Sequence, residues 1–185
     1  MSGHGAGHID PANKKVALLI AVLALVLAFS ETLGKAAQTS ALAYHIESSN
    51  LWSFFQAKTI RQTTIRTAAE EMEAQYGDKA PDAVKKQVDA WKKTAERYQS
   101  EPETNEGRKE LMARAKEREA KRDRATAAYH HYELASAAVQ IAIVLASAQI
   151  ITGVAALLWI AYGLGAIGVF FSLIGLFWPT AIHIF

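Results

Sequence analysis

The sequence predicts an all-α membrane protein with three transmembrane helices and a long antiparallel coiled-coil helical hairpin between the first and the second. Three observations lead to this fold class. Residues 134–185 contain no Lys, Arg, Asp or Glu, and residues 16–29 form an uninterrupted apolar run. Residues 34–133 hold 18 of the 20 basic and 16 of the 18 acidic residues. Helix-period patterns run through that charged segment, without the alternation that is typical of strands.

Composition excludes several classes of protein. A water-soluble domain cannot hide the 52 uncharged residues at 134–185, so a purely soluble globule is excluded. The chain has no Cys, which rules out a disulfide-stapled fold, a Cys nucleophile and a thiolate metal site. A formal net charge of +2 gives no reason to expect nucleic acid as a partner. The lipid bilayer is the partner that the composition predicts.

The first predicted span covers residues 14–33 and follows an N-terminal tail at residues 1–13. Its apolar run of 14 residues is shorter than the roughly 20 that cross a bilayer. Lys14 and Lys15 can extend it by snorkelling, and residues 30–33 can lie in the headgroup layer. A cleavable signal peptide is the alternative, because two Lys precede the apolar run. The nearest small-x-small site, at residues 41–43, lies too far downstream, so we favour an uncleaved span.

The second and third predicted spans are residues 134–151 and 155–178. The turn between them falls near residues 151–153, where Gly weakens a helix. Pro179 ends the third span, and residues 179–185 form a C-terminal tail.

Small and polar residues recur at helical spacing within the spans, which predicts packing seams. Lipid gives no hydrophobic drive for pairing helices, so small residues that allow close backbone approach, and interhelical hydrogen bonds, must provide it. The predicted seam residues are Ala17, Ala21, Ala24 and Ala28 in the first span, Gln140 in the second, and Ala161, Gly165, Gly168, Ser172 and Gly175 in the third.

Residues 34–133 form the predicted extramembrane hairpin. A seven-residue step from Ala37 to Met72 continues the first span as one helix to about residue 76. Pro81 starts a second helix, and the polar linker 101–107 separates it from a third that runs into the second span. At 1.5 Å per residue the first arm is about 65 Å long, and the other two helices together are about 67 Å. The chain therefore returns to the bilayer only if both of those helices descend along the first.

Three aromatic residues, Trp52, Phe54 and Phe55, crowd one stretch of the ascending helix. Their side chains spread around the helix, so one antiparallel neighbour cannot cover all of them. Burial of such a side chain is worth roughly 2–3 kcal/mol. We therefore predict that a second copy, or another membrane protein complex, covers the remaining face, and that the protein is a homo-oligomer.

Candidate chemistry is sparse. His4 and His8 lack a third metal ligand, so they indicate a solvated tail, and the adjacent His130 and His131 point about 100° apart and indicate an interfacial belt. Glu31 either pairs with Lys35 or lines an oligomer axis. No nucleophile, phosphate-loop or dinucleotide motif occurs in the sequence. We therefore predict no enzyme activity, no catalytic residue, no cofactor and no metal site.

The basic residues give a divided answer on orientation. Lys14 and Lys15 outnumber Lys35, which favours a cytoplasmic N-terminus. Five basic residues at 116–124 precede the second span, whereas none lies between the second and third spans. This larger bias favours a cytoplasmic hairpin.

Four segments also resemble a known family. Residues 8–15, 30–35, 50–58 and 139–147 resemble a bacterial membrane-protein family catalogued only as a domain of unknown function, and WSFFQAK at 52–58 is the most specific part. The resemblance implies a bacterial inner-membrane protein with this arrangement of spans, and it implies no activity.

Two functions fit these observations. The first is a non-enzymatic, membrane-anchored helical scaffold or interaction protein, homo-oligomeric. The alternative is a small channel or transport accessory subunit whose oligomer encloses Glu31 and Gln140. The spans lack charged residues at the bilayer midplane, which a transporter should show.

Overall fold

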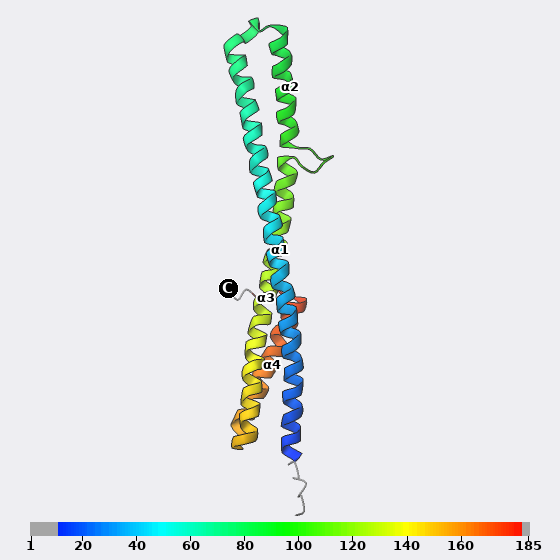
Figure 1. Ribbon diagram of the computed structural model, residues 1–185, viewed down its shortest axis with the longest axis vertical. Helices are drawn as coiled ribbons and strands as arrows, with labels where there is room; N and C mark the ends of the chain where they lie inside the picture. Colours follow the sequence, from blue (N-terminus) through cyan, green and yellow to red (C-terminus); the bar gives the residue numbers. More distant parts are fainter. Residues whose placement is uncertain (1–10, 183–185) are drawn as a thin grey trace, which may run out of the picture. The chain divides into compact units, whose positions relative to one another are not determined.

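The structure, a computed structural model that describes residues 11–182, consists of four α-helices (Figure 1). They are α1 (Pro11–Tyr76), α2 (Asp82–Gln99), α3 (Arg108–Thr152) and α4 (Ala155–Phe177), with a short 3-10 turn η1 (Gly77–Lys79) after α1. No strand occurs within the described range. The all-α fold class is confirmed.

The interruptions between helices coincide with Gly and Pro. Gly77 and Gly153 have φ angles of 52° and 72°, a left-handed conformation that favours glycine. Pro81 precedes the first residue of α2, where its fixed φ and missing N–H cost nothing. The longest break, residues 100–107, contains Pro102 and ends at Gly107. The breaks predicted near residues 77–80 and 102–107 are thus present.

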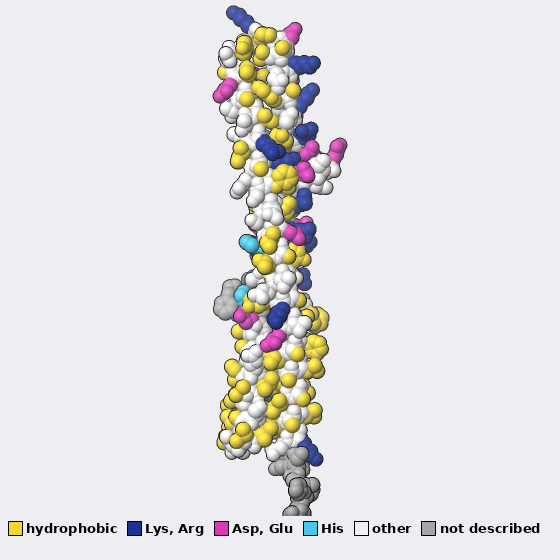
Figure 2. Space-filling model, in the orientation of Figure 1, with side chains coloured by type: hydrophobic (Ala, Val, Ile, Leu, Met, Phe, Trp, Pro, Cys, Tyr) yellow, Lys and Arg dark blue, Asp and Glu magenta, His cyan; other side chains and the backbone are white. Residues whose placement is uncertain are grey.

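Three helices, α1, α3 and α4, are long and apolar enough to cross a membrane, by length and composition. Figure 2 shows a mostly hydrophobic surface over α4 and the stretches of α1 and α3 beside it, with Lys, Arg, Asp and Glu gathered over α2 and its neighbours. The structure is therefore compatible with a membrane protein.

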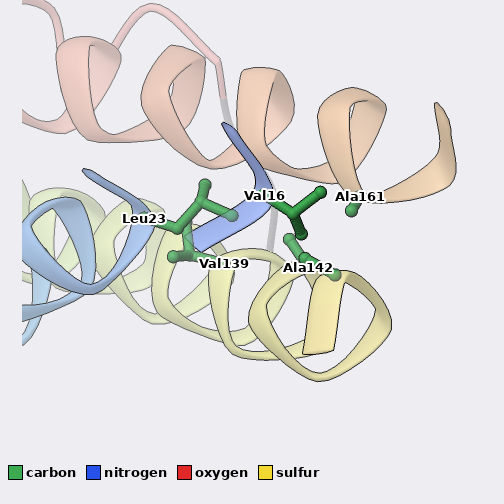
Figure 3. Close-up of a cluster of buried hydrophobic side chains, with 6 residues drawn as sticks. Val16, Leu23, Val139, Ala142 and Ala161 are labelled. Carbon is green, nitrogen blue, oxygen red and sulfur yellow. The ribbon is translucent and has the colours of Figure 1, made fainter. Parts of the chain in front are cut away.

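The chain divides into two compact units. The apolar unit comprises Met1–Ala41 and Asp123–Phe185, and the charged unit comprises Leu42–Arg122. In the apolar unit, small and branched side chains of α1, α3 and α4 form one buried cluster (Figure 3). Its members are Val16, Leu23, Val139, Ala142, Ala146 and Ala161. Five of these six are Val or Ala at positions facing another helix, which lets the three backbones approach closely.

In the charged unit, α1 contacts both α2 and the first part of α3. The order of these contacts is reversed: the nearer an α1 residue lies to the N-terminus, the farther along the chain is its partner in α2 or α3. In that order the hydrogen-bonded pairs are Lys92 with Glu73, Gln99 with Gln62, Arg108 with Thr59, and Glu119 with Trp52. The buried apolar side chains here are few and mostly small: Ala69, Val88, Ala95, Leu111 and Ala115.

Candidate functional site

The glycines of α4 mark the closest helix contacts of the apolar unit. A Cβ added to Gly168 would overlap the Val139 side chain and lie 3.1 Å from the Ala135 carbonyl oxygen. A Cβ on Gly165 would lie 2.8 Å from Leu23 Cδ2. Each glycine therefore permits an approach that a larger residue would block. Along α4, Ala161, Gly165, Gly168 and Gly175 are buried and Ser172 is half-buried.

A hydroxyl pair joins α1 to α4. The Oγ atoms of Ser30 and Ser172 lie 2.7 Å apart and are hydrogen-bonded. Ser30 is buried, with 1% of its surface exposed. The spacing of seven residues from Val16 to Leu23 to Ser30 shows which face of α1 is turned inward.

The predicted seam of α1 lies on the other face. Ala17, Ala21, Ala24 and Ala28 are all exposed on the apolar unit. They leave a stripe of small side chains on α1 that no helix of the described chain covers, and we call this the alanine stripe. Its role in packing remains a prediction, because the described residues leave it exposed.

Glu31 and Gln140, which the sequence analysis placed together only in an oligomer, contact each other within one chain. Gln140 Nε2 donates to Glu31 Oε1 at 3.2 Å, and both residues are exposed. The alternative pair of Glu31 with Lys35 is not formed among the described residues. The apolar unit thus presents a carboxylate and an amide, held together, on its surface.

His131 is buried rather than part of an interfacial belt. It is 1% exposed, and its Nε2 lies 3.0 Å from the Pro179 carbonyl oxygen, within hydrogen-bonding distance. Its ring stacks on Phe171 with centroids 6.0 Å apart. These contacts tie the residues after α4 to α3. This role could not be predicted from the sequence, because two adjacent His give no sign of which one faces a neighbouring helix.

The aromatic cluster of the charged unit, Trp52, Phe54 and Phe55, is half-buried in its own chain. Trp52 Nε1 donates to Glu119 Oε1 at 2.8 Å, and its ring meets Phe55 edge-on at 5.4 Å. Lys58 Nζ lies 5.4 Å from the centroid of the Phe54 ring, and Arg108 Cζ lies 5.0 Å from the centroid of the Phe55 ring. Each aromatic thus has a partner within the unit, and its contact with a second copy stays a prediction.

A buried polar layer lies beside this cluster, formed by Lys58, Gln62 and Arg108. Lys58 and Gln62 are only 5% and 4% exposed. Gln62 Nε2 donates to the Ala95 carbonyl at 2.8 Å, and Arg108 Nη1 donates to Gln62 Oε1 at 2.5 Å. Lys58 lies 3.4 Å from Glu101 and 3.9 Å from Glu106. Because buried polar groups need partners, this layer favours one register of α1 against α2 and α3.

The sequence contained a sign of this layer. Lys58 occupies one step of the seven-residue series that is otherwise mostly apolar. The partners of Lys58 and Gln62 could not be inferred, because they come from distant positions on α2, α3 and the linker.

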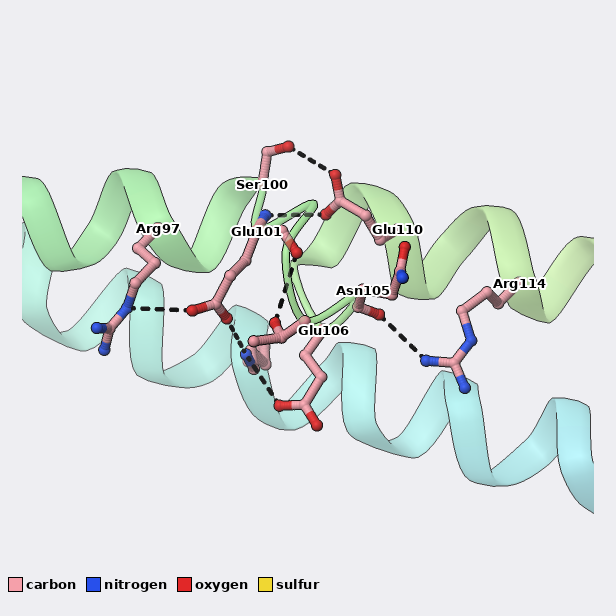
Figure 4. Close-up of polar contacts among 9 residues, drawn as sticks. Arg97, Ser100, Glu101, Asn105, Glu106, Glu110 and Arg114 are labelled. Carbon is pink, nitrogen blue, oxygen red and sulfur yellow. Dashed lines mark hydrogen bonds and ion pairs between the residues drawn. The ribbon is translucent and has the colours of Figure 1, made fainter.

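The linker 100–107 is closed at its base by Glu110 (Figure 4). Glu110 accepts a hydrogen bond from the Ser100 hydroxyl at 2.6 Å and one from the Glu101 backbone N–H at 3.1 Å. The Ser100 hydrogen bond holds the pKa of the Glu110 carboxyl below its usual value, and the Glu101 N–H adds to this. Farther along, Arg114 Nη1 donates to the Asn105 carbonyl at 3.1 Å. The linker is therefore a shaped loop, which Figure 1 shows projecting between α2 and α3.

Surface ion pairs supplement the charged unit. The hydrogen bond to Glu73, at 2.5 Å, raises the pKa of the Lys92 ammonium. The hydrogen bond from Lys121 lowers the pKa of the Glu117 carboxyl. Exposed pairs of this kind contribute little to stability.

A metal site is not indicated by side-chain geometry. In residues 11–182, no three His, Asp or Glu side chains are grouped to hold an ion. His4 and His8, considered above as weak metal ligands, lie outside the described residues. The contacts described above join helices to one another, and the remaining polar and apolar side chains form exposed surfaces.

Comparison with known proteins gives one match. A family model described as Domain of unknown function (DUF4337) matches residues 12–178. Neither a curated protein nor a solved structure matches the chain significantly.

Proposed function

The chain belongs to the DUF4337 family, whose description names no activity, and from this starting point we propose that it is a non-enzymatic, membrane-anchored helical scaffold that acts as a homo-oligomer. The apolar unit is the anchor in this proposal, and the charged unit is the part that binds a partner. That partner is a second copy or another membrane protein complex.

The proposed location is the bacterial inner membrane, crossed by α1, α3 and α4. The support is the length and apolar composition of these three helices. Large hydrophobic side chains also remain exposed on them, among them Leu18, Phe29, Val144 and Phe170 at 66%, 62%, 66% and 55%. Lipid would cover such side chains, whereas water would leave a large apolar patch exposed.

The charged unit is, in this proposal, an antiparallel coiled-coil hairpin. The reversed order of its hydrogen-bonded pairs, from Glu73–Lys92 to Trp52–Glu119, supports this arrangement. The buried layer at Lys58 and Gln62 would fix the register, as single buried polar residues do in other coiled coils.

The alanine stripe is the observation that carries the scaffold proposal. The small residues of α4 are used within the chain, whereas those of α1 lie on its surface. Close packing of small residues drives association of helices in lipid, so an uncovered stripe fits a second copy of the chain. In this proposal the small residues of α4 pack against helices of the same protomer, and the alanine stripe of α1 packs against a second protomer.

Mass measurement in lipid nanodiscs tests this proposal. We expect the full chain to form an oligomer, and Ala21→Leu with Ala24→Leu to shift it toward the monomer, because the larger side chains keep the helices apart. Ala166→Leu places the same change on an exposed residue of α4 and should leave the mass unchanged. A monomeric wild-type chain would contradict the proposal.

A second candidate function is a small channel or transport accessory subunit. The observation that favours it is the exposed pair Glu31 and Gln140, joined at 3.2 Å at the end of the apolar run of α1. A polar pair facing lipid is costly, and a shared axis of several chains would give it water. Ion flux into liposomes that is lost in Glu31→Gln, with the oligomer intact, would favour the channel over the scaffold.

A further inference from the structure

An open, shallow cavity with charged side chains at its rim lies between α1 and α3 in the apolar unit. Its volume is about 350 Å³, near the lower end of the usual range for small-molecule sites. Residues 30–38 line it from α1 and residues 129–136 from α3. The side chains that matter below are Glu31, Lys35, Gln38, Tyr129 and Glu133.

The two carboxylates at the cavity each contact a neighbouring side chain. Gln140 donates to Glu31 Oε1 at 3.2 Å, which leaves Oε2 without a hydrogen bond in the described structure. Tyr129 donates to Glu133 Oε1 at 3.4 Å, and His130 Nδ1 lies 3.6 Å from Glu133 Oε2. Each carboxylate keeps lone pairs that can accept hydrogen bonds from an ammonium group.

Lys35 supplies the opposite charge at the same cavity. Across the described residues its ammonium has neither a hydrogen bond nor an ion pair, although Glu31 lies one helical turn away. The cavity thus offers two carboxylates and a separate, unused ammonium, with the Gln38 amide beside it. A zwitterion that carries an ammonium and a phosphate a few bonds apart matches this distribution of charge.

The position of the cavity selects a lipid as the source of that zwitterion. On α1 it follows the apolar run 16–29, and on α3 it lies where the charge-free segment 134–185 begins. If the apolar unit spans a membrane, as proposed above, this level is the headgroup layer.

We infer that this cavity binds the headgroup of phosphatidylethanolamine. The ammonium would lie between Glu31 and Glu133, and the phosphate would meet Lys35 and Gln38. A glycerol headgroup brings no cation to the carboxylates. A choline headgroup brings a cation without N–H donors, so it cannot donate to them. The inference rests on the membrane placement in the proposed function.

Native mass spectrometry of the full chain tests this, with equal amounts of phosphatidylethanolamine, phosphatidylcholine and phosphatidylglycerol in the micelle. We expect retention of the ethanolamine lipid to exceed that of the other two about tenfold, the effect of one or two charge-assisted hydrogen bonds. Glu31→Gln with Glu133→Gln should abolish the preference while keeping side-chain size. Glu71→Gln, an exposed carboxylate of the charged unit, is the matched control and should keep it.

Three results would overturn the inference. Equal retention of the three lipids is one, and a preference that survives the double variant is another. Failure of soluble glycerophosphoethanolamine, at a concentration far above that of the lipid, to displace it is the third, because a headgroup site must also accept the headgroup alone. Extraction of the chain from membranes by alkaline carbonate would instead refute the membrane placement. An integral chain without lipid preference leaves that placement intact.

Discussion

Lys58 is a charged residue whose ammonium is buried between helices and whose two carboxylates both come from the linker. Glu101 lies 3.4 Å away and Glu106 lies 3.9 Å away, and their side chains are 21% and 50% exposed. A buried cation that loses its partners is costly, whereas a cation replaced by an apolar side chain of similar size is often tolerated. The Phe54 and Tyr98 rings, each 5.4 Å from the ammonium, would pack well against such a replacement.

This geometry predicts a loss of stability that a further substitution, at Lys58, restores. Glu101→Gln with Glu106→Gln should lower the free energy of unfolding by about 1–3 kcal/mol, because Lys58 is left buried without a carboxylate. Adding Lys58→Met should restore most of the loss. Hydrogen–deuterium exchange of residues 42–122 in the full chain measures the change, with the exposed Glu103→Gln as control. Additive losses in the triple variant would show that Lys58 does not depend on these carboxylates.

Glu110 predicts a pH-dependent linker. Its folded pKa lies below the ordinary value of 4.5, so its stabilising contribution is present above that value and is lost as pH falls through the folded pKa. The base of the linker should therefore loosen only in acid, when the hydrogen bonds from Ser100 and Glu101 to the carboxylate weaken.

The chain has no Cys, so Thr104→Cys gives a single site for a nitroxide label at the exposed tip of the linker. We expect its mobility in the spin-resonance spectrum to rise as the pH is lowered below 4.5. In Glu110→Gln the mobility should be high at every pH. A label that is equally restrained in acid would exclude this carboxylate as the clamp.

Among the helices, α1 and α4 show how far sequence patterns determine packing. Both carry small residues at a 4-3 spacing, and the sequence predicts a packing seam in each. In the structure the α4 seam is largely buried, whereas α1 buries Val16, Leu23 and Ser30 and exposes its alanines. On an apolar helix, every face consists of apolar residues at helical spacing. The spacing therefore identifies the stripe of small residues, but it does not determine whether that stripe or another face of the helix is buried.

In the charged unit, the ends of the helices could be predicted from the sequence, whereas the contacts between the helices could not. Gly77, Pro81 and Pro102 stop or start helices through their own backbone chemistry, so the breaks could be predicted locally. The contacts of Gln62 and Arg108 depend on which turns meet in three dimensions. No local pattern contains that information.

The glycines of α4 predict a position-dependent effect. Gly168→Ala should destabilise the apolar unit by about 1–3 kcal/mol, because its Cβ would overlap Val139. Gly163→Ala changes the same helix in the same way where nothing lies within 4 Å, and it should be neutral or slightly stabilising. Thermal melting in detergent compares the two. Equal melting temperatures would show that α4 does not pack closely on α3.

For the whole molecule, the proposed orientation predicts whether a reporter enzyme inserted in the charged unit is active. Alkaline phosphatase inserted between Thr104 and Asn105 should be inactive, because five basic residues at 116–124 favour a cytoplasmic hairpin. A β-galactosidase fusion at the same place is the complementary control and should be active. High phosphatase activity would mean that Lys14 and Lys15 determine the orientation instead.

The closed base of the linker also bears on how the family can change over evolutionary time. Ser100 and Gly107 lie so near each other that a Cβ on Gly107 would be 2.7 Å from the Ser100 Cα. Glu101 and Glu106 make their contacts close to this base, and Asn105 contacts Arg114 of α3, which leaves the tip at residues 102–104 outside these helix contacts. Residues can then be gained or lost at the tip without shifting α3 along α1. We expect homologous chains to differ in length here more than anywhere else in the charged unit.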